Sequence, residues 1–237
     1  MMSNQKLPIV VDLEMSGLIP TDNGIWQIGA VDLNNPEKIF FDESRIDDDE
    51  IVDEGALKVI GKTEEQLRNP KKQSQQEMIE KFFSWVELRP LRNLLCQNPQ
   101  FDAGFLAEKA RKYGIKKTFH YRSFDLHSIA QTKYHEVNGK FSTHEHNSSM
   151  DLKGILEFCG VPDLRIQLRD GKVIQEGNPH NALEDAKLTG ECFFRIIFGK
   201  NIFPEYAKYK IPKYLEREGT PRDSIRIGKF APEDKRK

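Results

Sequence analysis

The stretch VVDLEMSGL, residues 10–18, places two carboxylates inside an apolar run. Side chains two residues apart on a β-strand lie on the same face, so Asp12 and Glu14 are expected side by side. Two like charges on a mostly buried strand are costly unless a positive charge lies between them. The sequence therefore predicts either a basic side chain or a bound cation at this point.

The composition bounds the class of protein. A length of 237 residues with 38% hydrophobic content suits one large domain with a sizeable core. Three widely spaced cysteines favour neither a disulfide framework nor a structural zinc site. The first apolar run, residues 7–13, is too short and too polar for a signal peptide or a membrane span. We expect a cytoplasmic protein without membrane contact.

The charge is unevenly distributed along the chain. Residues 200–237 hold 11 Lys and Arg against 6 Asp and Glu, so this end carries +5 and the first 199 residues carry −6 of the total of −1. We assign residues 1–199 to one domain and residues 200–237 to a basic, tyrosine-containing extension. Basic residues interleaved with tyrosines suit phosphate contacts and base stacking, whereas packing of the extension against the domain is the alternative.

Hydrophobic patterns predict a meander of three strands followed by alternating strands and helices. The predicted strands cover residues 7–14, 26–33, 38–41, 93–96 and 119–125. The predicted long helices cover residues 74–88, 101–114, 126–133, 151–158 and 181–198. Asp170-Gly171 predicts a hairpin over residues 164–175. This order predicts an α/β or α+β domain with a mixed sheet.

An acidic run at residues 42–54 also invites a metal site. Its carboxylates are consecutive, and no strand spacing fixes them relative to one another. We interpret this run as a solvated loop.

Two further acids and a histidine complete the candidate site. Asp102 begins a helix directly after the strand at 93–96, and Asp185 lies in the last long helix behind His180. Residues five apart on a helix are separated by about 140°, so His180 and Asp185 cannot share a face if both are helical. Because Pro179 favours a start near His180, we expect Asp185 to point inward from the helix while His180 approaches from a loop.

Four converging carboxylates form a site for hard divalent cations, because oxygen ligands in number suit Mg²⁺ or Mn²⁺. Two such ions about 3.5–4 Å apart can hold the attacking and leaving oxygens of a phosphoryl displacement. A histidine with an ordinary pKa of about 6.5 can accept the proton of the attacking water at neutral pH. The predicted metal ligands are Asp12, Glu14, Asp102 and Asp185, and the predicted general base is His180.

Three motifs together resemble a known family. VVDLEMSGL, CQNPQFDAGFL and HNALEDAKL are similar to the three exonuclease motifs of the DnaQ-like (DEDDh) superfamily of 3′-to-5′ exonucleases, which includes proofreading subunits, RNase T and oligoribonuclease. The resemblance covers about residues 7–198. It implies an RNase H-like fold, with a mixed central sheet of about five strands flanked by helices.

The resemblance also implies roles for single residues. In such enzymes Asp12, Glu14 and Asp185 would ligate one metal ion, and Asp12 would bridge to a second. Asp102 would support the second ion largely through water, and His180 would be the general base. The terminal nucleotide would lie against the backbone after the first acids, with an apolar wedge at its base. The substrate-binding residues implied are Met15, Ser16, Gly17, Leu18 and Phe101.

The leading hypothesis is a 3′-to-5′ exonuclease that releases nucleoside 5′-monophosphates from single-stranded DNA or RNA. LEMSGL is nearer to oligoribonuclease, whereas FDAGFL and HNALEDA are nearer to DnaQ and RNase T, so the substrate stays open. The alternatives are a phosphodiesterase of small nucleotides or oligoribonucleotides and a catalytically silent nucleic-acid-binding protein. A homodimer is possible, and no motif separates DNA from RNA.

Overall fold

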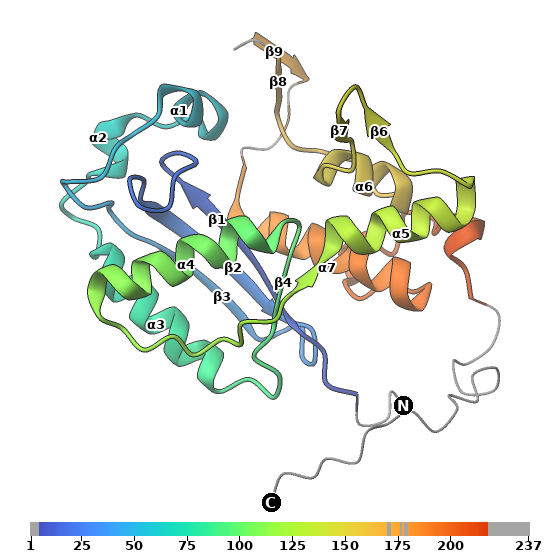
Figure 1. Cartoon of the computed structure of the whole chain (residues 1–237), viewed down its shortest axis with the longest axis horizontal. Coiled ribbons are helices and arrows are strands. Elements are labelled where there is room, and N and C mark those ends of the chain that lie inside the picture. Colours follow the sequence, from blue (N-terminus) through green and yellow to red (C-terminus); the bar gives the residue numbers. More distant parts are fainter. Residues whose placement is uncertain (1–4, 170–171, 176, 178–179, 218–237) are drawn as a thin grey trace, which may run out of the picture.

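The computed structural model describes residues 5–169, 172–175, 177 and 180–217. A five-stranded sheet runs through its centre in the order β3-β2-β1-β4-β5 (Figure 1). The meander strands pair antiparallel, whereas β1–β4 and β4–β5 pair parallel. The strands are β1 (Ile9–Met15), β2 (Ile25–Asp32), β3 (Ile39–Glu43), β4 (Leu94–Cys96) and β5 (Phe124–Asp125). The predicted mixed sheet of five strands flanked by helices is confirmed.

Helices cover both faces of the sheet. α3 (Gln75–Glu87) and α4 (Pro99–Tyr113) share an apolar cluster with Ile9, Val11 and Leu13 of β1. Val10 points to the opposite face and packs with α5 (Leu126–Asn138), α6 (Leu152–Cys159) and α7 (Ala182–Phe198). Asp12 and Glu14 share the face of Val10, because side chains alternate along a strand. The strand therefore presents both carboxylates on the side that α7 covers.

Shorter elements complete the described chain. α1 (Glu54–Ile60) and α2 (Glu64–Leu67) follow the acidic run, and β6 (Thr143–His144) pairs with β7 (Asn147–Ser148). The predicted hairpin is confirmed as β8 (Gln167–Arg169) paired with β9 (Lys172–Gln175), although its turn at 170–171 lies outside the described residues. Two 3₁₀ turns, Pro204–Tyr206 and Lys213–Leu215, follow α7.

Local signals explain most element ends. Ser74 and Thr63 each form a capping box at the start of α3 and α2. Gly114 and Gly160 end α4 and α6 in the left-handed conformation, where a side chain would be strained. The predicted strand at 119–125 is wrong over most of its length, because only Phe124–Asp125 pair with β4 and the preceding residues are held as a loop.

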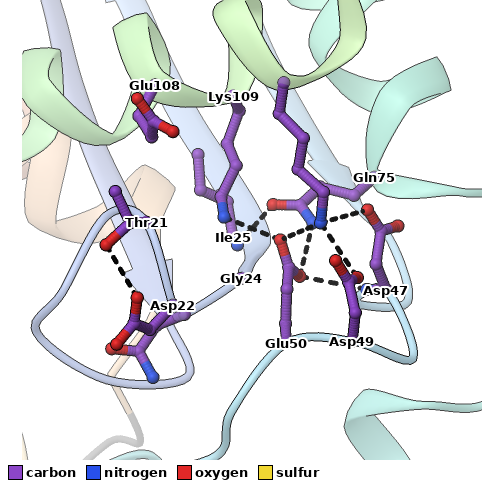
Figure 2. Close-up of polar contacts among 12 residues, drawn as sticks. Thr21, Asp22, Gly24, Ile25, Asp47, Asp49, Glu50, Gln75, Glu108 and Lys109 are labelled. Carbon is purple, nitrogen blue, oxygen red and sulfur yellow. Dashed lines mark hydrogen bonds and ion pairs between the residues drawn. The ribbon is translucent and has the colours of Figure 1, made fainter.

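The acidic run at 42–54 is not a solvated loop throughout, and that interpretation is corrected. Glu50 is buried, and its Oε1 lies 2.6 Å from Nζ of the fully buried Lys109 of α4 (Figure 2). Lys112 Nζ lies 2.8 Å from Asp47 and 3.0 Å from Asp49. The contact between Glu50 and Lys109, which lie 59 residues apart in the sequence, buries this part of the run, so the local composition of the run could not reveal it.

The described part of the C-terminal segment packs on the domain. Arg195 of α7 is fully buried, and its guanidinium donates to the carbonyl oxygens of Tyr206 and Tyr209, each at 3.0 Å. Phe203 and Leu215 join the apolar cluster of α7. Residues 218–237 of the predicted extension lie outside the described residues.

All three cysteines are buried and free. Among the described residues, none of the helices combines the length and the apolar character that crossing a bilayer requires.

Candidate active site

β1 and β2 set the floor of the site. Asp12 pairs with Gly29 across the two strands, and Glu14 pairs with Gln27. A Cβ atom at Gly29 would lie 2.1 Å from backbone atoms of Ala182, so the glycine lets the first turn of α7 approach the sheet directly beside Asp12. This close approach brings α7 over the two acids.

The start of α7 is fixed by two side chains. Gln27 Oε1 accepts a hydrogen bond from the backbone N–H of Ala182 at 2.8 Å. Asn181 is the N-cap, and its Oδ1 accepts from the N–H groups of Leu183 and Glu184. Because the helix begins at a fixed point, Asp185 lies one turn inside it and faces the sheet.

The histidine approaches from outside the helix, as the spacing predicts. His180 precedes the N-cap, and its Nδ1 lies 3.4 Å from Asp185 Oδ2. Ligand atoms of Glu14, His180 and Asp185 all lie within 4.8 Å of one another. Three side chains from β1, α7 and the segment before α7 thus meet at one point.

Asp102 enters the site from α4. It lies in the first turn and is 7% exposed, and the backbone of Leu13 on β1 is close enough to its carboxylate to lower its pKa. β4 ends at Cys96, and its register with β1 pairs Leu95 with Val10. The C-terminal half of β1 therefore extends past β4, and Asp102 lies against the strand there.

Burial raises the pKa values of three of the acids, and neighbouring negative charges add to this effect at Asp12 and Glu14. Burial, then the charges of Asp185, Asp102 and Glu14, raise the pKa of Asp12 well above its usual range. Burial and the charge of Asp185 raise the pKa of Glu14 to about 7. Burial raises the pKa of Asp102 to about 7, even though its backbone hydrogen bonds lower it. The hydrogen bond to Asp185 raises the pKa of His180. The cluster holds more negative charge than its own cations neutralise.

Sequence reasoning missed one cation of the site. Arg165, between α6 and β8, places Nη1 3.3 Å from Asp185 Oδ2. Its Nε and Nη2 each lie 2.9 Å from an oxygen of Asp163, which fixes the guanidinium. A lone arginine in a loop carries no pattern that assigns it to a site. The only signal is the Asp-x-Arg spacing of 163–165.

The residues present fit a divalent cation. Asp185 Oδ1 is one of four buried side-chain polar atoms in the described part of the chain that have no hydrogen-bond partner. An unpartnered carboxylate oxygen is costly to bury, and a cation would satisfy it. Carboxylate oxygens with one imidazole match hard divalent ions better than a thiolate site would. Glu14, His180 and Asp185 could hold such an ion, and the charges of Asp12 and Asp102 lie close to the same point.

A cleft of about 530 Å³ opens beside the acids, a volume typical of small-molecule pockets. Its wall includes the expected substrate residues Met15, Gly17, Leu18 and Phe101. Leu18 is 73% exposed and free to contact a ligand. α1 forms a further part of this wall, which sequence reasoning did not assign to the site. The α1 residues of this wall are Gly55, Ala56, Val59 and Ile60.

Ser16 has a different place from the other four expected substrate residues. It is fully buried, and its hydroxyl donates to the carbonyl of Ile51 at 2.8 Å and accepts from the N–H of Gly24 at 2.9 Å. Its own carbonyl accepts from the N–H of Asp53, the N-cap of α1, at 2.7 Å. Ser16 therefore ties α1 to the end of β1 and sets the position of the cleft wall.

Solved exonucleases share the fold. The structure is similar to cell-death related nuclease 4 (TM-score 0.59, 13% identity, 82% of this chain and 64% of that one). It is also similar to the nuclease domain of 3′hExo, described as a DEDDh family member bound to rAMP (0.58, 16%, 89% and 98%). A third similar structure is E. coli exonuclease I with a dT13 oligonucleotide (0.58, 15%, 81% and 41%).

Sequence comparison points the same way. The chain is 24% identical over 189 residues to the PolC-type DNA polymerase III of Caldanaerobacter subterraneus subsp. tengcongensis, covering 80% of this chain. It spans only 11% of that polymerase. The exonuclease family model RNase_T matches residues 9–193. This match covers most of the chain and confirms the resemblance that the three motifs predict: the chain belongs to the RNase_T family of exonucleases.

Proposed function

We propose that the protein is a metal-dependent 3′-to-5′ exonuclease that releases nucleoside 5′-monophosphates from single-stranded ends. The observation that carries this proposal is the meeting of Glu14, His180 and Asp185 beside an unpartnered carboxylate oxygen, at the end of a cleft with apolar walls. The acids suit cations and phosphate chemistry, whereas the apolar walls suit the face of a base.

Each part of the site has a role in this reaction. Two bound Mg²⁺ or Mn²⁺ ions would supply an activated water and charge compensation at the phosphate. Leu18 and Phe101 would hold the terminal base in the cleft that both line, which positions the last phosphodiester bond at the acids. His180 would accept the proton of the attacking water.

The protonation state of His180 depends on Asp185. Its pKa is raised by the hydrogen bond to that carboxylate, and a base must be neutral to accept a proton. If Asp185 ligated a cation instead, it would no longer raise the pKa of His180, and the neutral imidazole would be favoured.

The substrate range is proposed as single-stranded DNA or RNA. The similar structures include one bound to rAMP and one in complex with dT13. A dinucleotide phosphodiesterase is the second candidate, because the volume of the cleft suits a single nucleotide and its wall does not require a long strand.

A time course with Mn²⁺ separates the candidates. The substrates are end-labelled single-stranded DNA, single-stranded RNA, duplexes and a dinucleotide, each run beside an Asp12→Asn control. The proposal predicts stepwise shortening from the 3′ end with release of 5′-monophosphates, abolished by EDTA and in the control. Cleavage of the dinucleotide alone would favour the second candidate, and binding without cleavage of any substrate would favour a silent binding protein.

A further inference from the structure

A second hollow, of about 400 Å³, lies beside the first turns of α4. One wall is formed by Pro99, Gln100 and Gly104 of α4, and the other includes Lys117 and Tyr121. Both belong to the loop of residues 114–123, which connects α4 to β5. Phe101 belongs to the same two turns of α4 but lines the cleft. The two hollows are therefore separated by about the width of one helix, ~10–12 Å.

The charge around this second hollow is concentrated. Residues 109–122 contain six Lys and Arg and no Asp or Glu, although the whole chain has a net charge of −1. Three of the six are paired with acids: Lys109, Arg111 and Lys112. The other three are exposed and have no ion-pair partner among the described residues: Lys116, Lys117 and Arg122. The unpaired cations of this segment thus lie on or next to the wall of the second hollow.

An exposed aromatic ring stands among these cations. Tyr121 is 70% exposed, its ring lies 4.4 Å from the ring of His120, and the Arg122 guanidinium lies 5.2 Å from its centroid. The backbone on both sides is anchored. His120 N–H donates to the carbonyl of Arg92 at 2.9 Å, and the carbonyl of Arg122 accepts from Asn93 Nδ2 at 2.7 Å. The ring is therefore held outward on a fixed loop.

Lys117 is positioned in a similar way. Its Nζ lies 4.8 Å from the centroid of the Phe119 ring, which is buried against Phe83. Thr118 Oγ1 donates to the carbonyl of Phe83 at 2.8 Å and holds this part of the loop to α3. The lysine stem is thus supported while its ammonium group remains in solvent.

We propose that the second hollow is a subsite for upstream nucleotides of a single strand whose 3′ end occupies the cleft. Tyr121 offers a face on which a base stacks, while Lys117 and Arg122 contact phosphates of the same strand. A duplex keeps its base faces stacked internally, so this platform selects single strands. The placement of the 3′ end in the cleft rests on the proposed function. Binding of a strand at the second hollow does not depend on cleavage.

The test measures binding without cleavage. A labelled single strand of about ten nucleotides, within the range of single-strand site sizes, is titrated in EDTA and followed by fluorescence anisotropy. Tyr121→Ala should weaken Kd about tenfold through loss of one stacked base. Lys117→Gln with Arg122→Gln should make the slope of log K against log salt shallower by about 1.4, because each phosphate contact on a single strand contributes about 0.7.

A matched control comes from the opposite end of the sheet. Lys38 is exposed and directly precedes β3. Its carbonyl accepts a hydrogen bond from the N–H of Asp32, which pairs with Ile9 at the start of β1 and not with the acids. Lys38→Gln should leave Kd and the salt slope at wild-type values. Variants of Tyr121, Lys117 and Arg122 that bind within twofold of this control would overturn the subsite.

Cleavage provides the second measurement. A dinucleotide cannot reach both hollows, so Tyr121→Ala should cleave it in Mn²⁺ at the wild-type rate while its KM for the longer strand rises. Equal losses on both substrates would show that Tyr121 acts on the cleft, and would contradict the proposal. If the wild-type protein cleaves nothing while the binding losses are found, the exonuclease proposal fails and the subsite stands.

Discussion

Two groups of acidic side chains in this molecule meet very different partners. In the loop cluster, Asp47, Asp49 and Glu50 lie against two lysines of α4, and both oxygens of Glu50 accept hydrogen bonds (Figure 2). The cleft cluster is Asp12, Glu14, Asp102 and Asp185. Only Arg165 and His180 approach it in the described structure, and one oxygen of Asp185 has no partner.

The difference separates a structural role from a binding role. Glu50, both of whose oxygens are satisfied within the protein, holds two segments together and has no vacant coordination to offer. In the cleft cluster, burial and neighbouring charges raise the pKa values of Asp12 and Glu14, and one oxygen of Asp185 has no partner, so this cluster needs charge from outside the chain. Acidic composition alone does not distinguish these cases, but a buried oxygen without a hydrogen-bond partner does.

The largest expected effect is on activity. Asp185→Asn keeps the shape of the side chain and removes one negative charge from the cleft cluster. We expect initial rates with Mn²⁺ to fall at least about 100-fold, beyond the range found when only an outer partner of a metal ligand is lost. The melting temperature in EDTA should be unchanged or higher, because like charges repel one another less. The control is Asp49→Asn in the loop cluster, whose side chain is 73% exposed, and it should retain activity within twofold.

The next effect is on stability. Lys109→Met removes the buried partner of Glu50, and breaking a buried ion pair from one side costs about 3–5 kcal/mol. Urea unfolding should show this loss, and adding Glu50→Leu should restore part of it. Lys116→Met, at an exposed position, should change the free energy of unfolding by less than about 0.5 kcal/mol. A Lys109→Met protein as stable as the Lys116→Met protein would remove the structural role of the loop cluster.

A third effect follows from the raised pKa values. The pKa values of Glu14 and Asp102 are about 7, above their ordinary values of 4.5 and 3.8. Between the ordinary pKa values and about 7, the metal-free folded state therefore binds more protons than the unfolded state. The stability that these two protonated acids contribute is lost as the pH rises through 7. In EDTA the melting temperature should fall from about pH 6 to about pH 8, and Glu14→Gln should reduce this fall.

Mn²⁺ should reverse the trend, raising the melting temperature most at the higher pH, because a ligand that binds only the folded state stabilises it. A melting temperature that rises with pH in EDTA in the wild type, and equally in Glu14→Gln, would contradict the charge imbalance of the cleft cluster.

The smallest expected effect concerns the cleft wall. Leu18→Ala removes apolar area that is exposed in the free protein, so it should leave the melting temperature unchanged and raise KM by about fourfold for each methylene-sized group that the substrate covers, at about 0.8 kcal/mol each. Initial-rate kinetics on a short single strand measure this change. A fall in kcat with KM unchanged would instead place Leu18 in the chemical step.

Much of the fold could be predicted because its signals are local. The two-residue period of β1, the capping box at Ser74 and the glycine at 114 each determine structure within a few residues. The strand at 119–125 could not be predicted correctly, because hydrogen bonds from His120 to Arg92 and from Asn93 to Arg122 hold those residues as a loop. β6–β7 carried no recognised turn signal.

The candidate site divides in the same way. Asp12 and Glu14 follow from strand geometry, and the relative placement of His180 and Asp185 follows from the helix start. Arg165 and the α1 wall depend on contacts between distant segments, which no spacing in the sequence reveals. The burial of Glu50 by Lys109 is a further contact of this kind.

Calorimetric titration of Mn²⁺ into the metal-free protein measures whether the cleft cluster binds metal ions. We expect uptake of two ions per chain with release of protons at about pH 7, as expected for a two-metal site built from carboxylates with raised pKa values. Uptake should be lost in Asp12→Asn and Asp185→Asn and retained in Asp49→Asn. Absence of uptake by the wild-type protein, or full uptake by the Asp12→Asn and Asp185→Asn variants, would contradict this expectation.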